Sequence, residues 1–427
     1  MEAAAAPAQA AAAPAQARRA AGALALVALA ACVVPLAAPG TGLVPGAAAG
    51  APGWIRGVYG SGFGLDGASY RDWLWVALAA YAGVVVFADA IGPRTIRIAV
   101  LAGVVGFALA PPLLSLDVFS YISYARLGVL HGLNPYATAP AAIPHDAAAM
   151  RVEDFQGATS VYGPLFTLGS YPLGLIGVPA ALWAMKALCA GAVLGIASLV
   201  GRLAERRGIS PARAIAFVAL NPLVLVQVVG GPHNDALMVL ALCGGVLLLT
   251  EGRAAGAGGF FVAAIAVKAS GAFAAPFALI GAGGQRLRTL GGAGTAALVL
   301  AAAGLAVFGT DVGHGLLVGP GGQTHTSYHS VPALLDRSLG LDLGVAKAVM
   351  LGLFGLLVAW LLIWTARGAD WVTAAAWCGV GLLIASPYVT PWYVLWPLPL
   401  VAVSRDRRLV LVTLALCAYQ LPAAIPA

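Results

Sequence analysis

The amino-acid sequence predicts an all-α polytopic membrane protein with about 11–13 transmembrane helices, because its apolar runs approach the roughly 20 residues that a helix needs to cross a bilayer. Of the 427 residues, 61% are hydrophobic and 9% are charged, whereas a soluble globular domain carries roughly 25% charged residues. So few charges cannot cover a water-exposed surface. The composition therefore excludes a soluble enzyme, a nucleic-acid-binding protein and a disordered chain.

The chain divides into a short tail and one large membrane domain. Residues 1–18 are mostly Ala, Pro and Gln, so we expect a disordered cytoplasmic tail. Residues 19–427 are expected to form a single integral membrane domain. Its apolar runs are 20–38, 73–91, 95–114, 179–201, 211–229, 235–250, 256–270, 271–284, 290–308, 343–366, 371–387, 391–404 and 408–426.

The positions of the basic residues predict the topology, since Lys and Arg concentrate in cytoplasmic loops. If the ambiguous run 162–178 crossed the membrane, the arginines at 202–213 would lie opposite those at 94–97. If it is a re-entrant or surface-embedded helix, both groups lie on the cytoplasmic side. We adopt this second topology, which places two long loops, 115–161 and 309–342, on the exoplasmic face.

The segment 115–136 opens the first of these loops and carries Asp117, Tyr121 and Tyr124. On a helix the three fall on one face, and the apolar opposite face is typical of a helix at the membrane interface. Asp117 is a candidate general base or, alternatively, only a helix cap. The tyrosines are candidate substrate contacts or part of an interfacial aromatic belt.

Three consecutive polar residues, His233, Asn234 and Asp235, lie in a turn between two apolar runs. They are candidate site residues, with helix capping by Asn234 or Asp235 as the alternative. Lys268 lies between two other apolar runs, and an intramembrane lysine is by default a functional candidate. We expect it to pair with an anionic head group or with a carboxylate such as Asp235, unless it merely extends to the interface.

Two further regions hold candidate substrate-binding residues. His325 and His329 have the spacing of a helical metal pair, but the Gly- and Pro-rich residues before them favour an irregular loop, and we predict no metal site. Trp392 and Tyr393 belong to the Pro- and aromatic-rich stretch 386–400. They line a groove for a sugar ring or an isoprenoid tail, or they form an interfacial belt.

Several of these motifs, in this order and spacing, resemble the actinobacterial polyprenyl-phosphomannose-dependent α-1,6-mannosyltransferases, integral membrane enzymes of the GT-C class. The resemblance covers roughly residues 95–400, and GGPHNDALM is its most specific part. Two departures are Pro232 beside the histidine and Ser160-Val161 before YGPLF. The matching motifs are DVFSYISYARLGVLHGLNPY (117–136), YGPLF (162–166), NPLVL (221–225), GGPHNDALM (230–238) and the lysine of AVKASG (266–271).

The resemblance implies a GT-C-like fold whose first large exoplasmic loop is catalytic, with Asp117 as the base of an inverting transfer. It implies polyprenyl-phosphomannose as donor and a lipid-anchored glycan of the lipomannan or lipoarabinomannan type as acceptor, at the outer face of the plasma membrane. Lys268, His233 and, more weakly, Arg126 are candidates for the donor phosphate, and Tyr162 is a candidate substrate contact. Membrane lipids are the other expected partners; no obligatory cofactor, metal or nucleic acid is expected.

Three alternatives remain open from the sequence. A GT-C enzyme that uses polyprenyl-phosphoarabinose or another sugar would share the same motifs. A transporter or flippase for lipid-linked sugars would show internal repeats or polar residues at the membrane midplane, which the sequence lacks. A non-catalytic membrane subunit would leave the grouping of Asp117, the His233–Asp235 turn and Lys268 on one face unexplained.

Overall fold

The computed structural model describes residues 6–40, 43–44, 53–60, 62–313, 325–423 and 425. All regular elements in these ranges are helices, which confirms the predicted fold class. The longest are α1 (Ala6–Ala37), α2 (Gly67–Ile91), α7 (Val178–Arg206), α12 (Arg286–Phe308) and α15 (Leu343–Ala366). The shorter α-helices are α3 (Pro93–Ala108), α4 (Asp117–His131), α5 (Pro164–Gly169), α6 (Tyr171–Leu175), α8 (Pro211–Ala219), α9 (Asp235–Thr250), α10 (Ala254–Val267), α11 (Ala275–Gly281), α14 (Val331–Leu339), α16 (Trp371–Ala385), α17 (Leu398–Ala402) and α18 (Arg407–Ala423).

Several tighter or wider helical turns join these helices. The segment η5 (Val224–Gly230) is a π-helix. The 3₁₀ segments are η2 (Gly53–Tyr59), η3 (Pro140–Ala142), η4 (Ala149–Arg151), η6 (Ala269–Ala274), η7 (Gly283–Gln285), η8 (Gly309–Asp311) and η10 (Pro391–Leu395).

Five helices of the described residues are long and apolar enough to cross a membrane, or six if the bent pair α8 and η5 counts as one span. The other predicted spans are shorter or broken helices. Pro222, for example, separates α8 from η5, which meet at 60°, because proline cannot continue a helix hydrogen-bond ladder. The chain is therefore a multi-pass membrane protein, several of whose hydrophobic segments do not span as single straight helices.

Helix α1 begins at Ala6, inside the segment 1–18 that the sequence predicts to be disordered. Alanine, the main residue of this segment, has the highest helix propensity. The helix is continuous with the apolar stretch Ala15–Ala37, so the helical conformation propagates from a segment that is itself long enough to span. The predicted disorder of the N-terminal tail stays a prediction.

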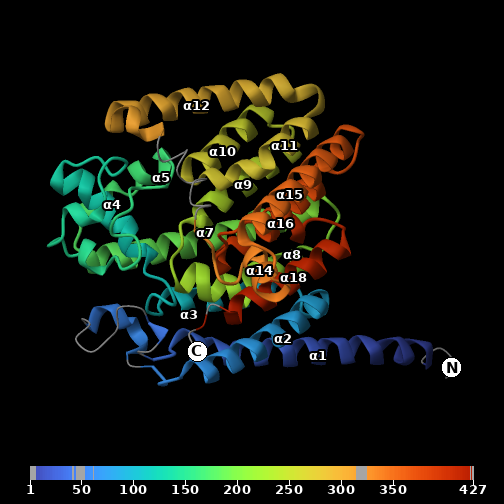
Figure 1. Cartoon of the computed structure of the whole chain (residues 1–427). Coiled ribbons are helices and arrows are strands. Elements are labelled where there is room, and N and C mark those ends of the chain that lie inside the picture. The colour runs from blue at the N-terminus through green and yellow to red at the C-terminus, as the bar shows by residue number, and fades with distance from the viewer. Residues whose placement is uncertain are drawn as a thin grey trace.

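The helices form a bundle with two outer layers. In Figure 1, α1 and α2 lie along the bottom and α12 along the top, with α7, α9, α10 and α16 between them. Contacts of α2 with α8 join the bottom layer to the bundle, and contacts of α10 with α12 join the top layer to it. The elements α4 to α6 lie at the left end of the bundle, and this group positions the candidate site.

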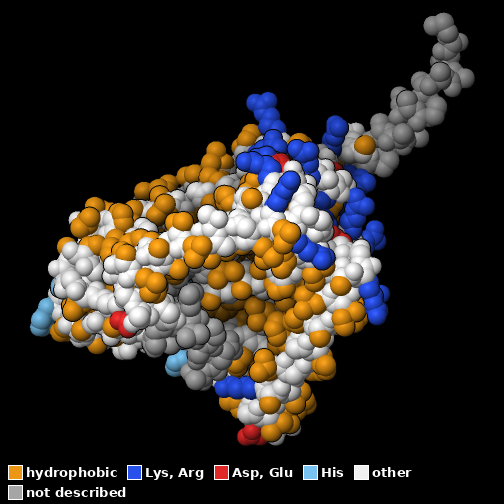
Figure 2. Space-filling view, turned by 90° about the horizontal axis from the view of Figure 1, so that it is seen from above, with side chains coloured by type: hydrophobic (Ala, Val, Ile, Leu, Met, Phe, Trp, Pro, Cys, Tyr) orange, Lys and Arg blue, Asp and Glu red, His pale blue; other side chains and the backbone are white. Residues whose placement is uncertain are grey.

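The basic residues gather at the opposite end of the bundle (Figure 2). Arg213 pairs with Asp89 at 2.5 Å and Arg207 pairs with Asp370 at 2.6 Å. These ion pairs bring the turns α2–α3, α7–α8 and α15–α16 to one end. The arginines at 202–213 therefore lie on the same end as those at 94–97, as the predicted topology requires.

The ambiguous run 162–178 does not form a single span. It contains α5 and α6, which have six and five residues, far fewer than the roughly 20 that a spanning helix needs. Helix α5 packs against α10 and α12, and α6 packs against α4 and α7. This agrees with the prediction that 162–178 enters or lies on the membrane without crossing it.

Helix α4 confirms the predicted helix at the start of the first long loop but lies deeper than expected. A helix at the interface would expose one face, whereas all eight residues from Val118 to Ala125 are buried. Contacts with α5, α6, α7, η3 and η4 enclose it. The expectation of an interfacial surface helix was therefore wrong for the first half of α4, because the rest of the loop folds back over it.

Candidate active site

Two aspartates begin helices whose N-termini meet in the interior. Asp117 is the first residue of α4 and Asp235 is the first residue of α9. The N-cap residues are Leu116 and Asn234, and neither makes a side-chain capping hydrogen bond. The capping interpretations of Asp117, Asn234 and Asp235 were therefore wrong, and the two carboxylates are free for other contacts.

The carboxylate of Asp117 faces the ring of His233. The distance between Asp117 Oδ2 and His233 Nδ1 is 3.4 Å, a close contact that is too poorly aligned for a hydrogen bond. The His233 side chain is fully buried, whereas that of Asp117 is 22% exposed. The carboxylate is thus open to a substrate on one side and supported by an enclosed imidazole on the other.

Trp392 covers the other face of the His233 ring. The two rings stack with centroids 3.6 Å apart and an interplanar angle of 13°. An aromatic stack of this kind contributes roughly 0.5–1.5 kcal/mol, so Trp392 holds the imidazole in place beside Asp117. Trp392, predicted to contact sugar or lipid, therefore has a structural partner within the site.

A second charged cluster surrounds Asp235. Lys268 Nζ lies 2.8 and 2.9 Å from the two carboxylate oxygens, and Trp396 Nε1 donates a hydrogen bond to Oδ1 at 2.6 Å. Asp235 is completely buried and the Lys268 side chain is 16% exposed. The prediction that Asp235 is the partner of Lys268 is confirmed.

Aromatic rings also fix the ammonium of Lys268. Nζ lies 4.7 Å from the ring centroid of Tyr393 and 5.6 Å from that of Trp396, both within the range of cation–π attraction. The ammonium group of Lys268 is therefore held by the Asp235 carboxylate and by the two aromatic rings, and part of the side chain stays exposed to solvent.

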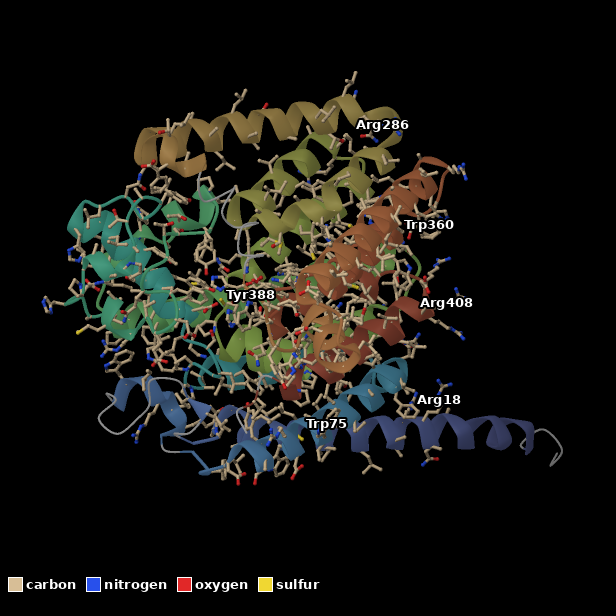
Figure 3. All side chains as sticks on the ribbon, in the orientation of Figure 1. Arg18, Trp75, Arg286, Trp360, Tyr388 and Arg408 are labelled. Carbon is tan, nitrogen blue, oxygen red and sulfur yellow. The ribbon has the colours of Figure 1, made fainter. Side chains whose placement is uncertain are left out.

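The Asp117 and Asp235 clusters belong to one site. Burial, followed by the nearby carboxylate of Asp117, raises the pKa of Tyr162 well above its usual value, and Asp235 adds to this effect. Tyr388, labelled near the centre of Figure 3, lies between the α4 group and the C-terminal helices. The site is thus formed where α4, α9, η6 and η10 converge.

Tyr121 and Tyr124 support Tyr162 from behind. Tyr121 meets Tyr162 edge-on, with ring centroids 5.1 Å apart, and the Tyr124 hydroxyl donates to Ala158 O at 2.9 Å. Tyr121 is 1% exposed and Tyr124 is 4% exposed, so neither presents surface to a substrate in this structure. Both phenols pack the site.

Arg126 lies outside the site. Its Nε is 3.0 and 2.9 Å from the two oxygens of Asp146, and His131 Nε2 is 3.1 Å from the same carboxylate. Arg126 and Asp117 are nine residues apart on α4, roughly 13 Å along the helix axis. The structure therefore separates Arg126 from Lys268 and His233, with which it was grouped as a phosphate ligand.

His325 and His329 lie in a non-helical segment before α14, so they lack the helical spacing of a metal pair. His325 lies beside Tyr388 at 6.5 Å between ring centroids, and His329 packs edge-on against Tyr419 at 6.1 Å. In the described part of the chain, no group of three His, Cys, Asp or Glu side chains could hold a metal ion. The role of the two histidines stays a prediction.

Two features of the site carry no sequence signal. Trp396 donates to Asp235, but the two residues are 161 positions apart. Gly231 must be a glycine, because a Cβ at this position would lie 2.5 Å from the carbonyl oxygen of Leu113. Both contacts follow from how distant segments pack, and only the tertiary structure reveals them.

Comparison with known proteins identifies the family. Residues 20–283 match the family described as "Alpha-(1->6)-mannopyranosyltransferase, N-terminal domain". The chain belongs to this family. Residues 327–426 of this mannosyltransferase match the family's companion C-terminal region, described as "MptB C-terminal domain". The predicted family and the predicted enzyme class are confirmed.

Curated relatives carry the same name. Alpha-(1->6)-mannopyranosyltransferase A of Mycobacterium tuberculosis is 29% identical over 85% of this chain and 75% of its own length. The A enzyme of Corynebacterium glutamicum is 31% identical over 44% of this chain and 39% of its own length. The B enzyme of that organism is 24% identical over 80% of this chain and 65% of its own length. No solved structure gives a significant match to the chain.

Proposed function

We propose that this protein transfers mannose from polyprenyl-phosphomannose to a hydroxyl of a lipid-anchored glycan, at the outer face of the plasma membrane and with inversion at the anomeric carbon. The observation that carries this proposal is the pairing of Asp117 and His233 beside the Asp235–Lys268 ion pair. A single displacement needs one base for the acceptor and one cation for the leaving phosphate. The site supplies one of each.

Asp117 is the proposed base. Its carboxylate is partly exposed and takes the proton of the acceptor hydroxyl as the hydroxyl oxygen attacks C1 of the donor mannose. The C1–O bond to phosphate breaks, and the electron pair leaves with the polyprenyl phosphate. One displacement converts a β-linked donor into an α-linked product, so no second carboxylate nucleophile is needed.

His233 is assigned to Asp117 and not to the phosphate. Its ring has no exposed surface and is enclosed between Asp117 and Trp392. The imidazole at this position orients the carboxylate toward the acceptor hydroxyl.

Lys268 is the proposed phosphate ligand. Asp235 and Trp396 fix it from the buried side, and its exposed part is available to an anion. A positive charge held before the reaction needs no reorganisation as the phosphate charge develops. Because the donor phosphate is already attached to a lipid, no nucleotide-binding metal is required, and we expect no obligatory cofactor.

Asn234, between His233 and Asp235 in the sequence, is a proposed sugar ligand. It is fully buried, and its amide nitrogen and oxygen have no hydrogen-bond partner in the structure. A sugar hydroxyl can bind this amide only when the side chains that cover it move, so the role of Asn234 as a sugar ligand stays a proposal. Tyr162, Trp392 and Tyr393 are the other proposed substrate contacts.

The proposed side of the membrane follows from the charge distribution. Helix α4, which begins at Asp117, lies at the left of Figure 1, and the basic residues gather at the opposite end (Figure 2). Since Lys and Arg concentrate on the cytoplasmic side, the site faces the exoplasm.

The test is transfer by the purified protein from radiolabelled polyprenyl-phosphomannose and, in parallel, from polyprenyl-phosphoarabinose to membrane acceptors. Product from the mannose donor, with α-1,6 linkage, supports the proposal. Transfer from the arabinose donor alone would show that the donor sugar is a pentose. Movement of the intact lipid donor across a vesicle membrane, without transfer, would instead support a transporter.

A further inference from the structure

Lys186 on α7 is a buried lysine that the proposed reaction does not use. It is 1% exposed, and its Nζ donates to the carbonyl oxygens of Gly230 at 2.7 Å, Val229 at 3.2 Å and Pro111 at 3.4 Å. A lysine ammonium has three N–H donors and no acceptor, so three carbonyls satisfy it fully. None of these carbonyls belongs to α7, and the side chain therefore ties α7 to two other segments.

The two segments are those that carry Asp117 and His233. Pro111 lies in the stretch that leads into α4, and Gly230 ends η5 just before His233. The backbone N–H of Leu113 also donates to Gly230 O, at 3.2 Å. The carbonyl oxygen of Gly230 thus accepts hydrogen bonds from both Lys186 and Leu113. We call this group of hydrogen bonds the junction, because it joins the segment that leads to Asp117 to the segment that leads to His233.

The backbone between this junction and Asp117 is strained. Leu114 has a φ of 58° and is the only described residue other than glycine with a positive φ. Such a conformation costs of the order of 1–3 kcal/mol and persists only where the surroundings enforce it. The hydrogen bonds of Pro111 and Leu113 immediately precede it, so the junction is well placed to enforce the strained entry into α4.

Helix α7 holds the His233 side of the junction at a second point. Cys189, one turn after Lys186, donates its thiol to His233 O at 3.3 Å. The backbone of the turn is therefore fixed both at Gly230 and at His233. Helix α7 acts as the common support on which the two halves of the site are aligned.

We propose that Lys186 is a positioning residue, which sets the separation of Asp117 and His233 without touching the substrate. This inference rests on the proposed function in that it takes Asp117 as the base. A misplacement of about 1 Å in a catalytic group can cost roughly 10²-fold in rate. Loss of the three hydrogen bonds releases both segments at once and moves the carboxylate relative to the imidazole.

The kinetic test compares Lys186→Met, which keeps the length of the side chain, with Lys186→Arg, which keeps the donors. We expect Lys186→Met to lower kcat by roughly 10²-fold with little change in the KM of the donor, and Lys186→Arg to recover part of the rate. The matched control is Arg207→Gln. Arg207 also binds a backbone carbonyl, Val403 O at 2.7 Å, but at the opposite end of the bundle, and its loss should leave kcat unchanged.

A double-mutant cycle separates positioning from general stability. In a His233→Gln background, Lys186→Met should cost much less than in the wild type, because the pair that it aligns is already lost. The positioning role is overturned if the fold-losses in kcat of the two single variants multiply in the double variant. It is also overturned if Lys186→Met retains the wild-type kcat.

Hydrogen–deuterium exchange tests the junction without any activity. Lys186→Met should speed amide exchange in both 111–117 and 229–234, whereas Arg207→Gln should change neither. If the wild type transfers no mannose from the lipid donor, the proposed function fails, and exchange alone decides the role of Lys186. Faster exchange in both segments then supports the junction, and unchanged exchange overturns it.

Discussion

The ring of His233 is held between Asp117 and Trp392, with Nδ1 3.4 Å from Asp117 Oδ2 and the indole stacked 3.6 Å from the imidazole. Three elements contribute to this arrangement: α4, the turn before α9, and η10. The stacking gives the first prediction. Trp392→Leu should lower kcat about tenfold, because a stacked aromatic pair contributes roughly 0.5–1.5 kcal/mol and its loss frees the imidazole that orients Asp117.

The matched control for Trp392 is Trp360→Leu. Trp360 also stacks on an aromatic ring, that of Trp364 at 5.5 Å and 7°, but it is 56% exposed on α15 and lies far from Tyr388 in Figure 3. Its replacement should leave kcat unchanged. Equal losses in both variants would show that the tryptophan on His233 has no special role.

Variants of Lys268 and Asp235 should distinguish an effect on thermal stability from an effect on mannose transfer. Lys268→Met leaves a fully buried carboxylate without its cation, which costs roughly 3–5 kcal/mol and should lower the apparent Tm in detergent. Adding Asp235→Asn should restore the Tm but not the transfer of mannose, because the phosphate still lacks its cation. A double variant that regains transfer would exclude Lys268 as the phosphate ligand.

The exposed pair Arg213–Asp89 provides the comparison for these measurements. Both side chains are 50% exposed, and an ion pair of this kind contributes only about 0–1 kcal/mol. Arg213→Met should therefore change the Tm little and leave transfer intact.

Asp146 should stabilise the first long loop in a pH-dependent way. Burial alone would raise the pKa of Asp146, but hydrogen bonds from His131, the backbone of Ala148 and Arg126 together lower the pKa. A carboxylate with a lowered pKa stabilises the fold above the unfolded pKa, near 3.9, and loses this effect as the pH falls through the folded value. Asp146→Asn should therefore reduce the Tm at pH 7.

The same difference should shrink when the pH is lowered below about 4, since the wild-type carboxyl then becomes protonated as well. Thermal unfolding of both proteins across this range measures the effect. A Tm difference that is the same at pH 7 and at the lowest pH would show that charge does not explain it.

Topology can be tested with engineered thiols, since the five native cysteines are all buried. Met150 lies in the first long loop and is 58% exposed, and the side chain of Arg206, at the arginine-rich end, is 63% exposed. An impermeant thiol reagent added outside intact cells should label Met150→Cys and not Arg206→Cys. The reverse pattern would place the site in the cytoplasm.

The sequence was sufficient to predict the candidate residues whose signal is local. Asp117 directly after an apolar run, three polar residues in a tight turn, and a lysine between apolar segments are unexpected in a membrane protein. The Lys268–Asp235 pair was also predictable, because a buried lysine needs a carboxylate at the same depth.

What the sequence could not predict depends on packing between distant segments. Trp396 reaches Asp235, and Trp392 reaches His233, only because η10 lies against α9 and η5. Arg126 was grouped with the phosphate ligands because nothing local shows that the loop returns Asp146 to it. The burial of α4 likewise follows from the path of the loop after it, which hydrophobic periodicity does not specify.

The central claim, that Asp117 is the base of the mannosyl transfer, is tested most directly by comparing Asp117→Asn with Asp146→Asn. Both replace an aspartate of the same loop with its amide, but Asp146 lies with Arg126 and His131, away from the site. With radiolabelled polyprenyl-phosphomannose and equal amounts of folded protein, Asp117→Asn should lose roughly 10²–10⁴-fold in transfer rate, and Asp146→Asn should retain the wild-type rate. Undiminished transfer by Asp117→Asn would contradict the account.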